Sequence, residues 1–336
     1  MQLTALVDSV DHVCCRYRLA ALRPALKRAG HTLELRPLPS GWWGRVQLFR
    51  SLRGADVILQ RRLLPSWQLF LLRRSVRTLI FDFDDAVFLR DSYAPKGIHH
   101  AGRLRRFAAT IRACDAVAAG NGFLAEQAVR LATQARVEVI PTCVDPARYP
   151  LAEPKRNEGV ELVWVGSSST LQGLRAVAPL LEEIGRGVPG VRLKLICDRF
   201  FEPRGLPIIA CPWSETGEAA NIAAADIGIA HVPDDLWSRG KCGLKVLQYM
   251  AAGLPVVANP VGVQAEMVRH GENGFLAETP AQWVEAIARL AHNPELRRRM
   301  GRMGRALLEA RWSVAAGTEC WLDLLDELER RRKRAA

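Results

Sequence analysis

The segment WSRGKCGLKVLQYMAAGLPVVAN (Trp237–Asn259) carries the pattern that decides the fold. Its apolar residues recur at helical spacing to about Ala252, and Gly253 is a typical helix stop. A short apolar strand is expected from Pro255 onward. A helix followed by a buried strand is the repeating unit of a parallel α/β sheet.

Three cations crowd the expected start of this helix: Arg239, Lys241 and Lys245. The helix macrodipole already places about half a positive charge there, so each cation is unfavourable by roughly 0.3–1 kcal/mol unless an anion binds. If the helix begins by Lys241, Lys241 and Lys245 share one face, and Gln248 extends it by a turn. The cluster could hold a diphosphate, with Gln248 on ribose or sugar hydroxyls. The alternative is a solvated basic patch.

The same alternation of strands and helices extends outward over almost the whole chain, which predicts parallel sheets with right-handed crossovers. We therefore expect an α/β protein with two doubly wound Rossmann-like domains facing a cleft, where ligands bind at the carboxyl ends of strands. The expected strands are 3–8, 32–38, 56–60, 77–85, 115–120, 137–141, 159–166, 191–197, 206–211, 226–232 and 254–259. The expected helices include 17–30, 121–133, 171–185, 214–225, 279–293 and 294–332, the last interrupted near 311–313.

The domain boundaries follow from a proline-rich, charged stretch without periodicity at 145–159, which we interpret as a linker. Residues 1–150 would form an N-terminal Rossmann-like domain, and residues 160–312 a C-terminal one. The helix at 313–336 would pack back toward the N-terminal domain.

The composition is that of a globular protein of 336 residues, with 49% hydrophobic and 24% charged residues. No apolar run is long enough to span a bilayer, and no secretion signal is recognisable. The eight cysteines form no Cys-x-x-Cys pair, which favours reduced thiols over a zinc site. We expect a cytoplasmic protein, peripheral on the inner face of the cell membrane.

The formal net charge of +12 favours anionic partners. The segments QRRLLPSWQLFLLRRSVR and HHAGRLRRFAATIR mix arginines with large apolar residues at helical spacing, as helices on an anionic membrane surface do. The alternative is that they pack on a core and leave a solvated arginine face. Nucleic-acid binding is not expected, because no aromatic RNA-binding signature or zinc finger is present.

The segment VWVGSSSTLQGL (163–174) combines a strand, a turn and a helix start. Backbone N–H groups and hydroxyls at Gly166, Ser167 and Ser168 could form an anion nest. Ser167 as a simple helix cap is the alternative. The chain has neither a Gly-x-Gly-x-x-Gly fingerprint nor a Walker A motif.

The segment LIFDFDDAVF (79–88) places Asp82, Asp84 and Asp85 at the end of a strand expected to be central. Crowded carboxylates need water, a cation or arginine partners. One of them could accept a proton from an acceptor hydroxyl. Arginine pairing and loop capping are the structural alternative, and a metal site lacks ligands at a recognisable spacing.

Four further residues are candidates by position. Arg16 and Arg18 follow the first strand and could face the same carboxylates, and Asn121 follows a strand end, where it is most simply a helix cap. Glu266, in GVQAEMV, is a donor-side candidate of low specificity. We expect His231 to be a packed strand-end residue.

Together these stretches resemble the retaining glycosyltransferases of family 4, which have the GT-B fold and use nucleotide-sugar donors. The resemblance is carried by ADIGIAHVPDD, by GKCGLKVLQYMAAGLPVVANPVGVQAEMVRHGENGFLAET and by RWS, with further similarity to a subgroup in LIFDFDDAVF and CDAVAAGNGFLAEQA. It implies that Lys245 is the lysine that holds the leaving diphosphate. It also implies that Gln248 stands for the second acid of an E-x7-E element, which contacts the donor ribose.

The chain departs from this family at three places. Gly240 stands where the first acid of the E-x7-E element contacts the donor sugar, Ser167 replaces part of the usual Arg and Lys pair, and no Gly-Gly loop follows the first strand. Arg239 and Lys241 could replace the cations lost near Ser167.

The expected activity is transfer of a sugar from a nucleotide-diphosphate sugar to an acceptor hydroxyl of a saccharide, lipid-linked or cell-surface glycan, with retention of the anomeric configuration. Lys245 is the expected catalytic cation, with Asp84 and Asp85 on the acceptor side, and neither a metal nor another cofactor is expected. The alternative is an inactive nucleotide-sugar-binding protein of the same fold.

Overall fold

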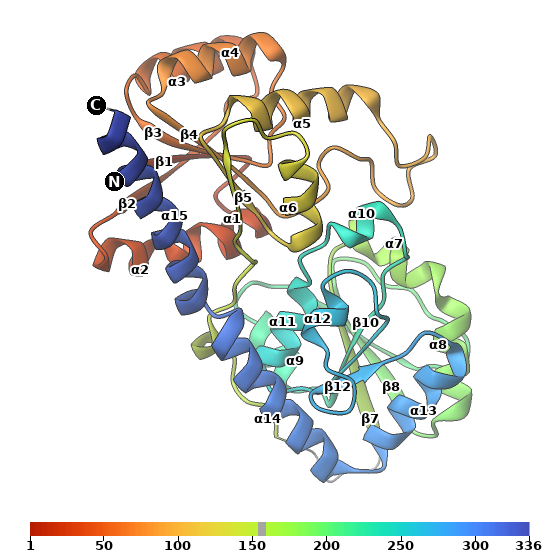
Figure 1. The fold of residues 1–336 in the computed structure, drawn as a ribbon. Helices are drawn as coiled ribbons and strands as arrows, with labels where there is room; N and C mark the ends of the chain where they lie inside the picture. Colours follow the sequence, from red (N-terminus) through yellow and green to blue (C-terminus); the bar gives the residue numbers. More distant parts are fainter. Residues whose placement is uncertain (154–158, 336) are drawn as a thin grey trace. The chain divides into compact units, whose positions relative to one another are not determined.

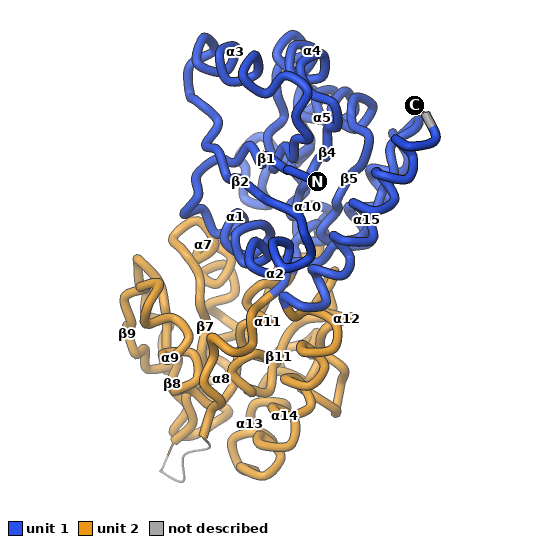
Figure 2. Tube along the Cα trace, turned by 90° about the vertical axis from the view of Figure 1, so that its left-hand side faces the viewer, with its two compact units in different colours: residues 1–143, 235–242, 314–336 blue, residues 144–234, 243–313 orange. Residues whose placement is uncertain are grey.

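The computed structural model describes residues 1–153 and 159–335 and divides into two compact units (Figure 2). Unit 1 comprises Met1–Cys143, Asp235–Cys242 and the segment from Val314 onward, and unit 2 comprises Val144–Asp234 and Gly243–Ser313. Each unit contains one sheet, and each is described by itself.

The sheet of unit 1 has six parallel strands in the order β2-β1-β3-β4-β5-β6 (Figure 1). The central strands are rich in β-branched and aromatic residues and are buried on both faces, as a doubly covered parallel sheet requires. The strands are β1 (Gln2–Val7), β2 (Thr32–Pro37), β3 (Asp56–Gln60), β4 (Thr78–Phe83), β5 (Ala116–Ala119) and β6 (Arg136–Val139).

Helices cover both faces of this sheet because alternate residues of each strand point to opposite sides. On β4, Phe81 and Phe83 pack in one cluster with helices α3 to α6, whereas Ile80 packs in another with α1, α2 and α15. The helices are α1 (Val13–Arg18), η1 (Ala20–Leu22), α2 (Arg23–Arg28), α3 (Trp42–Ser51), α4 (Ser66–Ser75), α5 (Ala101–Ala113), α6 (Gly122–Val129), α10 (Leu236–Arg239) and α15 (Val314–Ala335).

The sheet of unit 2 also has six parallel strands, in the order β12-β11-β10-β7-β8-β9. The direction of strand progression reverses between β7 and β10, which is the switch point where doubly wound sheets bind ligands at their carboxyl ends. The strands are β7 (Val160–Val165), β8 (Val191–Cys197), β9 (Ile208–Pro212), β10 (Ile227–Ala230), β11 (Val256–Ala258) and β12 (Gly274–Leu276).

The helices of unit 2 bury amphipathic stripes against its sheet, with Trp283 and Ile287 of α13 as examples. Two of them start at residues expected from the sequence: Ser167 precedes α7, and Thr279 caps α13 with Pro280 in the first turn. The helices are η2 (Pro146–Arg148), α7 (Ser168–Ala176), α8 (Ala178–Gly187), α9 (Glu218–Ala223), α11 (Leu244–Ala251), α12 (Gln264–Met267), α13 (Pro280–Ala291) and α14 (Pro294–Arg311).

The expectation of two doubly wound α/β domains is confirmed, and all eleven expected strands are present. The sequence analysis missed β12, because a three-residue strand has no measurable periodicity. The helix expected at 17–30 is instead α1, η1 and α2, with Pro24 at the start of α2. The helix expected at 171–185 is likewise broken, and α8 begins beside Pro179.

The helix expected to begin by Lys241 is also corrected. α10 ends at Arg239, and α11 begins only at Leu244, after Gly243 in the left-handed region at φ 66°. Lys241 and Lys245 therefore do not share a helix face. Arg239 lies in the last turn of α10, where the macrodipole favours a cation.

The division into units differs from the expected boundaries at two places. Residues 144–150 belong to unit 2 and residues 235–242 to unit 1, and α15 packs on α2 and η1 of unit 1. The linker expected at 145–159 includes η2, and its part at 154–158 lies outside the described residues.

All eight cysteines are free of disulfide bonds, and most are buried. Over residues 1–153 and 159–335, no helix combines the length and the apolar character that a bilayer crossing would require.

Candidate active site

Arg18 and Asp82 form a buried ion pair at the centre of unit 1. Their side chains are 1% and 0% exposed, and the Arg18 Nε lies 3.0 Å from Oδ1 and 3.2 Å from Oδ2 of Asp82. The same carboxylate accepts from Nε2 of Gln60 at 3.0 Å, and Arg18 donates to the carbonyl of Ile140 at 2.9 Å. Burial disfavours the charged guanidinium, but Asp82 outweighs it and raises the pKa of Arg18.

This geometry places two residues expected on the acceptor side, Arg18 and Asp82, in a structural role. Their polar atoms are used by each other and by neighbouring groups, so they are not presented to a ligand. The alternative of arginine pairing therefore applies to Asp82.

Asp84 and Asp85 follow β4 and face Arg61, which follows the neighbouring strand β3. Arg61 donates to Oδ2 of Asp85 at 2.8 Å, its Nε lies 3.5 Å from Oδ1 of Asp84, and it also contacts Sγ of Cys14. Arg61 has φ 58°, a strained value for a residue with a side chain. Strain of this kind persists only where the surroundings enforce it, and here it accompanies a cluster of charges.

The two carboxylates differ in their surroundings. Asp85 is 15% exposed and pairs with both Arg61 and Nζ of Lys241, the latter at 2.9 Å. Asp84 is more deeply buried, and its Oδ1 has no hydrogen-bond partner in the part of the chain that the structure describes. Burial, followed by the charge of Asp85, raises the pKa of Asp84, although Arg61 and Arg18 oppose this. Burial and a neighbouring like charge both make the Asp84 carboxyl harder to ionise.

This difference predicts a pH-dependent stability. A carboxyl group whose pKa is raised in the folded state contributes stability that is present below its unfolded pKa, about 3.9, and is lost as the pH rises through the folded value. The variant Asp84→Asn lacks this titration. We expect wild type to lose stability relative to Asp84→Asn as the pH rises above about 4, as measured by urea unfolding of both proteins. A difference that does not change with pH would contradict the raised pKa.

Cys14, Asp84 and Asp85 bring potential metal ligands within 4.8 Å of one another. The guanidinium of Arg61 lies against all three, so a cation of this chain already balances their charge. Burial, followed by the charge of Asp84, also raises the pKa of the Cys14 thiol, which disfavours the thiolate that metals bind. The donor set fits an arginine-neutralised cluster better than a metal centre.

Residues 235–242 are held in unit 1 by Asn121 and Cys242. The Asn121 side chain caps α6 by accepting from the amide of Leu124 at 2.8 Å, and its Nδ2 donates to the carbonyls of Arg239 (3.2 Å) and Lys241 (3.0 Å). Sγ of Cys242 lies 3.2 Å from the carbonyl oxygen of Asp84. Asn121 thus caps α6 and also holds residues 235–242 by hydrogen bonds, so its side-chain amide is used within unit 1.

Lys241 is likewise engaged within unit 1. Besides its ion pair with Asp85, its ammonium lies 4.5 Å from the ring centroid of Trp237. The interpretation of Lys241 as a second phosphate clamp beside Lys245 is not supported by these contacts. Arg16, half-buried on α1, stacks on Tyr17 at 5.6 Å.

Gly240 has a packing reason to lack a side chain. A Cβ at this position would lie 2.8 Å from Cβ and 2.9 Å from the backbone nitrogen of Ala86, closer than real contacts allow. An acidic side chain at this position would therefore collide with the loop after β4. The departure at Gly240 is coupled to the packing of residues 235–242 in unit 1.

We expect Gly240→Glu to lower the stability of the protein by roughly 1–3 kcal/mol or more, because overpacking a rigid contact forces the backbone to shift. Activity should not increase, although the substitution introduces the acid that the resemblance noted in the sequence analysis would place here. Chemical unfolding of Gly240→Glu and of the control Gly122→Ala, where a Cβ meets nothing within 4 Å, tests this. Equal stabilities of the two variants would show that the position has room for a side chain.

In unit 2, the loop after β7 lies at the switch point of the sheet. A Cβ at Gly166 would overlap the Trp164 ring and would lie 2.6 Å from Oγ1 of Thr170, so the turn requires glycine. The Ser167 amide donates to Oγ1 of Thr170 at 3.2 Å. Ser168 donates its amide to the carboxylate of Asp198 at 2.6 Å. Hydrogen bonds from the Ser168 side chain and, second, from this amide lower the pKa of Asp198.

The start of α7 thus already carries an anion of the protein. Asp198 occupies an amide that a phosphate would need, so α7 is a less suitable diphosphate site than its serines suggest. Ser167 and Ser168 are exposed, and their hydroxyls are within reach of solvent.

Lys245 is the second residue of α11, the helix that follows β10 across the switch point. Its ammonium lies 4.8 Å from the ring centroid of Trp164 on β7, so it sits over the edge of the sheet where the strands end. Gly243 precedes the helix and has no side chain with which to cap it, and a Cβ there would lie 2.6 Å from Sδ of Met267. A cation, a helix start and the switch point coincide here, which suits a bound anion.

Gln248, the other donor-side residue on α11, lies in a buried polar network. Its Nε2 donates to Oε1 of Glu218 at 2.8 Å and lies 3.2 Å from the hydroxyl of Tyr149. The indole of Trp213 donates to the other oxygen of Glu218 at 2.6 Å. Gln248 therefore stands beside a carboxylate supplied by α9.

The remaining candidates lie further along the sheet edge. Glu266 is exposed on α12, the short helix after β11. His231 follows β10, and its ring lies 6.2 Å from the Trp283 ring at an interplanar angle of 48°. Burial lowers the pKa of His231, which favours the neutral ring. This agrees with the expectation of a packed strand-end histidine.

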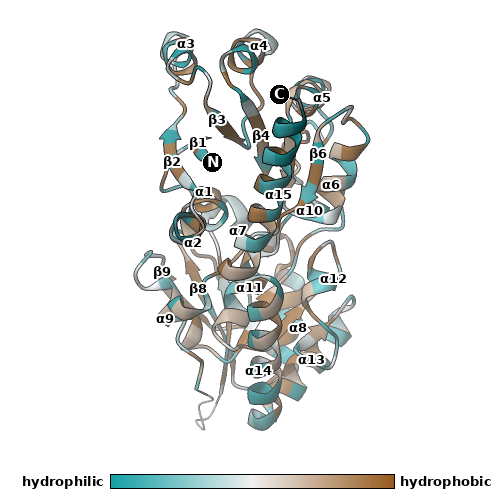
Figure 3. Cartoon of the chain, turned by 60° about the vertical axis from the view of Figure 1, so that its left-hand side comes forward, coloured by the Kyte–Doolittle hydropathy of each residue, from teal (hydrophilic) through white to brown (hydrophobic). Residues whose placement is uncertain are grey.

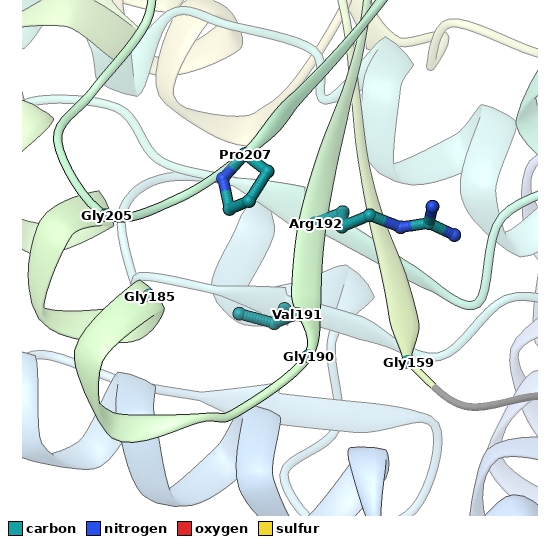
Figure 4. Close-up of a pocket in the computed structure, with 7 residues that line it drawn as sticks. All are labelled: Gly159, Gly185, Gly190, Val191, Arg192, Gly205 and Pro207. Carbon is teal, nitrogen blue, oxygen red and sulfur yellow. The ribbon is translucent and has the colours of Figure 1, made fainter.

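A hollow in unit 2 lies at the other end of the sheet. It has a volume of about 450 Å³ and is framed by residues before β7, β8 and β9, including Gly159, Gly190 and Gly205 (Figure 4). The Arg192 guanidinium extends from it toward β7 and pairs with Glu161 at 3.1 Å. Ligands of doubly wound sheets bind at the carboxyl ends, so this hollow is not the candidate site.

Three residues that contact the candidate site residues were not identified from the sequence: Arg61, Trp164 and Glu218. Arg61 follows β3, and adjacent parallel strands end at one edge, so its position beside β4 could have indicated it. Trp164 reads as a buried strand residue, which it is. Glu218 has no sequence signal, because its approach to Gln248 depends on how α9 packs on α11.

A comparison with protein families matches residues 236–307 to Glycosyl transferases group 1. D-inositol 3-phosphate glycosyltransferase of Streptomyces griseus is 32% identical over 162 residues, or 43% of this chain and 33% of the relative. The enzyme of the same name from Streptomyces scabiei is 30% identical over 184 residues, or 48% of this chain and 40% of the relative. The chain therefore spans less than half the length of these curated relatives.

Solved structures share the fold over nearly the whole chain. Sucrose-phosphate synthase of Thermosynechococcus elongatus has a TM-score of 0.77 at 14% identity, and each chain is covered fully. HepE of Anabaena, solved with UDP and glucose, has a TM-score of 0.69 at 16% identity and covers 97% of this chain and 100% of its own. Residues 236–307 thus match Glycosyl transferases group 1, and the two parallel-sheet units share the GT-B fold of these solved structures.

Proposed function

We propose that this protein is a glycosyltransferase that moves a sugar from a nucleotide-diphosphate sugar to an acceptor hydroxyl. The observation that carries the proposal is Lys245, at the start of α11 and over the Trp164 ring, at the switch point of unit 2. The match of residues 236–307 to Glycosyl transferases group 1 supports it. The complex of HepE with UDP and glucose makes a UDP-sugar the first donor to test.

In the proposed reaction, the bond between the anomeric carbon and the phosphate oxygen breaks, and the acceptor oxygen forms a bond to the same carbon. The nucleoside diphosphate leaves with two negative charges near the reacting centre, where the Lys245 ammonium and the first amides of α11 would stabilise them. The acceptor proton passes to the departing phosphate oxygen on the same face of the sugar. This course retains the anomeric configuration.

We propose that the reaction needs no metal ion, because protein cations take over the role of charge neutralisation. Arg61 plays that part among the carboxylates of unit 1, and Lys245 in unit 2. Sugar transfer that continues at an unchanged rate in excess EDTA is the expected result. Activity that is lost in EDTA and restored by Mg²⁺ or Mn²⁺ would refute this part of the proposal.

For the acceptor, we propose a saccharide, free or linked to a lipid, with Asp84 and Asp85 as orienting groups. Asp85 is held by Arg61 and Lys241 and keeps a partly exposed carboxylate, so it can accept a hydrogen bond from a hydroxyl. We also propose that this protein lies in the cytoplasm and binds peripherally to an anionic membrane. This location suits an acceptor that is carried by a lipid.

The second candidate is a nucleotide-sugar-binding protein without catalysis, motivated by Gly240. The contact with Ala86 gives the glycine a packing role, which weakens the inference that a lost acid means lost activity.

Slow hydrolysis of the nucleotide sugar separates the two candidates. Release of nucleoside diphosphate from UDP-, GDP- and ADP-sugars is measured by chromatography, without acceptor. We expect hydrolysis of one donor class by wild type and none by Lys245→Ala. Tight binding of a nucleotide sugar without release of nucleoside diphosphate, either alone or with candidate acceptors, would favour the binding protein.

A further inference from the structure

Unit 1 has a cluster of exposed aromatic side chains on α3 and α4, the helices that precede β3 and β4 in the chain. Trp42, Trp43, Trp67 and Phe70 are 60%, 54%, 47% and 58% exposed. The Trp42 ring lies edge-on to Trp43 at 5.5 Å and to Trp67 at 6.4 Å, so the two helices form one aromatic surface. We call these four residues the aromatic face.

The aromatic face is not part of the core of unit 1. The same helices bury other residues, Phe49 on α3 and Leu69 and Leu72 on α4, against the sheet. Large aromatics on the opposite side of an amphipathic helix are unusual, because solvent normally meets polar residues there. Hydrophilic and hydrophobic segments alternate along both helices in Figure 3.

The charge around the aromatic face has one sign. Every charged side chain on α3, α4 and the adjoining α5 is an arginine. Arg74 lies over the Phe70 ring at 5.5 Å, and Arg50 is exposed seven residues after Trp43, on the same side of α3. On α5, Leu104 is 50% exposed and has Arg103, Arg105 and Arg106 as exposed neighbours.

We infer that α3, α4 and α5 dock the protein on an anionic lipid bilayer, with the aromatic face at the level of the headgroups. Tryptophan and phenylalanine beside arginines are the composition of helices that lie in a membrane interface. The amphipathic indole rings of the tryptophans partition to the headgroup region, and the arginines pair with lipid phosphates. A bilayer of zwitterionic lipids would gain nothing from the uniform positive charge. A protein partner would need a complementary surface of acidic side chains.

This inference names the surface through which the membrane proposed above as a partner would bind. It is independent of the donor site, since the aromatic face lies in unit 1 and Lys245 in unit 2. Nucleotide-sugar hydrolysis by a variant of the aromatic face should therefore stay at the wild-type level, so the two proposals can fail separately.

The test is binding of the full chain to vesicles of phosphatidylcholine, alone or mixed with phosphatidylglycerol. Two variants are compared with wild type: an aromatic variant, Trp42→Ser with Trp67→Ser and Phe70→Ser, and an arginine variant, Arg50→Ser with Arg74→Ser. The matched controls are Val129→Ser with Met303→Ser, at exposed apolar positions, and Arg299→Ser with Arg302→Ser on α14.

We expect wild type to bind the mixed vesicles and to stay in solution with phosphatidylcholine alone. The arginine variant should bind about 30-fold more weakly, since each arginine near an anionic surface contributes about 1 kcal/mol. The aromatic variant should lose roughly tenfold or more. Brominated lipid should quench the tryptophan fluorescence of wild type. The quenching should be much weaker for the aromatic variant.

Three outcomes would overturn the inference. Wild type could remain in solution with mixed vesicles, or the control variants could lose binding as strongly as the others. The aromatic variant could also convert a dimer to a monomer while vesicle binding stays unchanged, which would assign the face to a second copy of this chain.

Discussion

We expect Lys245→Ala to lower kcat/KM for sugar transfer by roughly 100- to 1000-fold, the loss typical for removal of one group that stabilises charge in a transition state. Lys245 begins α11 at the switch point of unit 2, and its ammonium packs over Trp164. A side chain held in this way is preorganised for the diphosphate that leaves. The loss should appear in kcat as well as in KM, because charge on the leaving group develops during the reaction.

The matched control is Lys241→Ala. The sequence makes the two lysines look equivalent, whereas the structure engages Lys241 with Asp85 and Trp237 in unit 1. Partly exposed ion pairs contribute little, so this variant should lose less than about tenfold in kcat/KM. Steady-state kinetics of both variants decide the matter, and equal losses would contradict the assignment of the clamp to Lys245 alone.

We expect Arg18→Ala to have the largest effect on stability, a loss of about 3–5 kcal/mol, because it leaves the fully buried Asp82 without its counter-charge. The ion pair has side-chain exposures of 1% and 0% and is linked to Gln60 and Ile140. Urea unfolding of the variant measures the loss. Arg36→Ala is the control, because the Arg36–Glu34 pair is exposed and should contribute less than about 1 kcal/mol.

The double variant Arg18→Met with Asp82→Leu separates a structural role from a catalytic one. Replacing both partners of a buried pair removes the uncompensated charge, so part of the lost stability should return. If the pair is structural, the folded double variant keeps transfer activity. Full stability with abolished activity would instead return Asp82 to the acceptor side, where the sequence analysis placed it.

Much of the fold could be predicted from the sequence because buried parallel strands have a strong local signal. VELVWV at β7 and TLIFDF at β4 consist mostly of apolar and aromatic residues, interrupted only by Glu161 in β7 and by Thr78 and Asp82 in β4. β12 was missed because three residues are too few for any period. Breaks inside helices, such as the one beside Pro179, were missed because the apolar spacing continues across them.

The candidate site was predictable in part. Lys245 stood out through its conflict with the helix dipole, which is a local property. The pairing of Asp82 with Arg18 was foreseen only as the alternative to a role on the acceptor side. The roles of Lys241 and Gly240 were not predictable, because each depends on a partner far along the chain, Asp85 and Ala86. Glu218 was missed for the same reason. Local patterns identify which residues are unusual, and tertiary packing decides what they contact.

The central claim is that unit 2 binds a nucleoside diphosphate through α11. A thermal-shift panel of UDP, GDP, ADP and their sugars, on wild type and Lys245→Ala, tests it most directly, because a ligand that binds only the folded state raises its stability. We predict that one nucleotide class raises the melting temperature of wild type in proportion to the logarithm of its concentration, and that Lys245→Ala shows little or no shift. No response of wild type to any nucleotide, or an equal response of the two proteins, would contradict the claim.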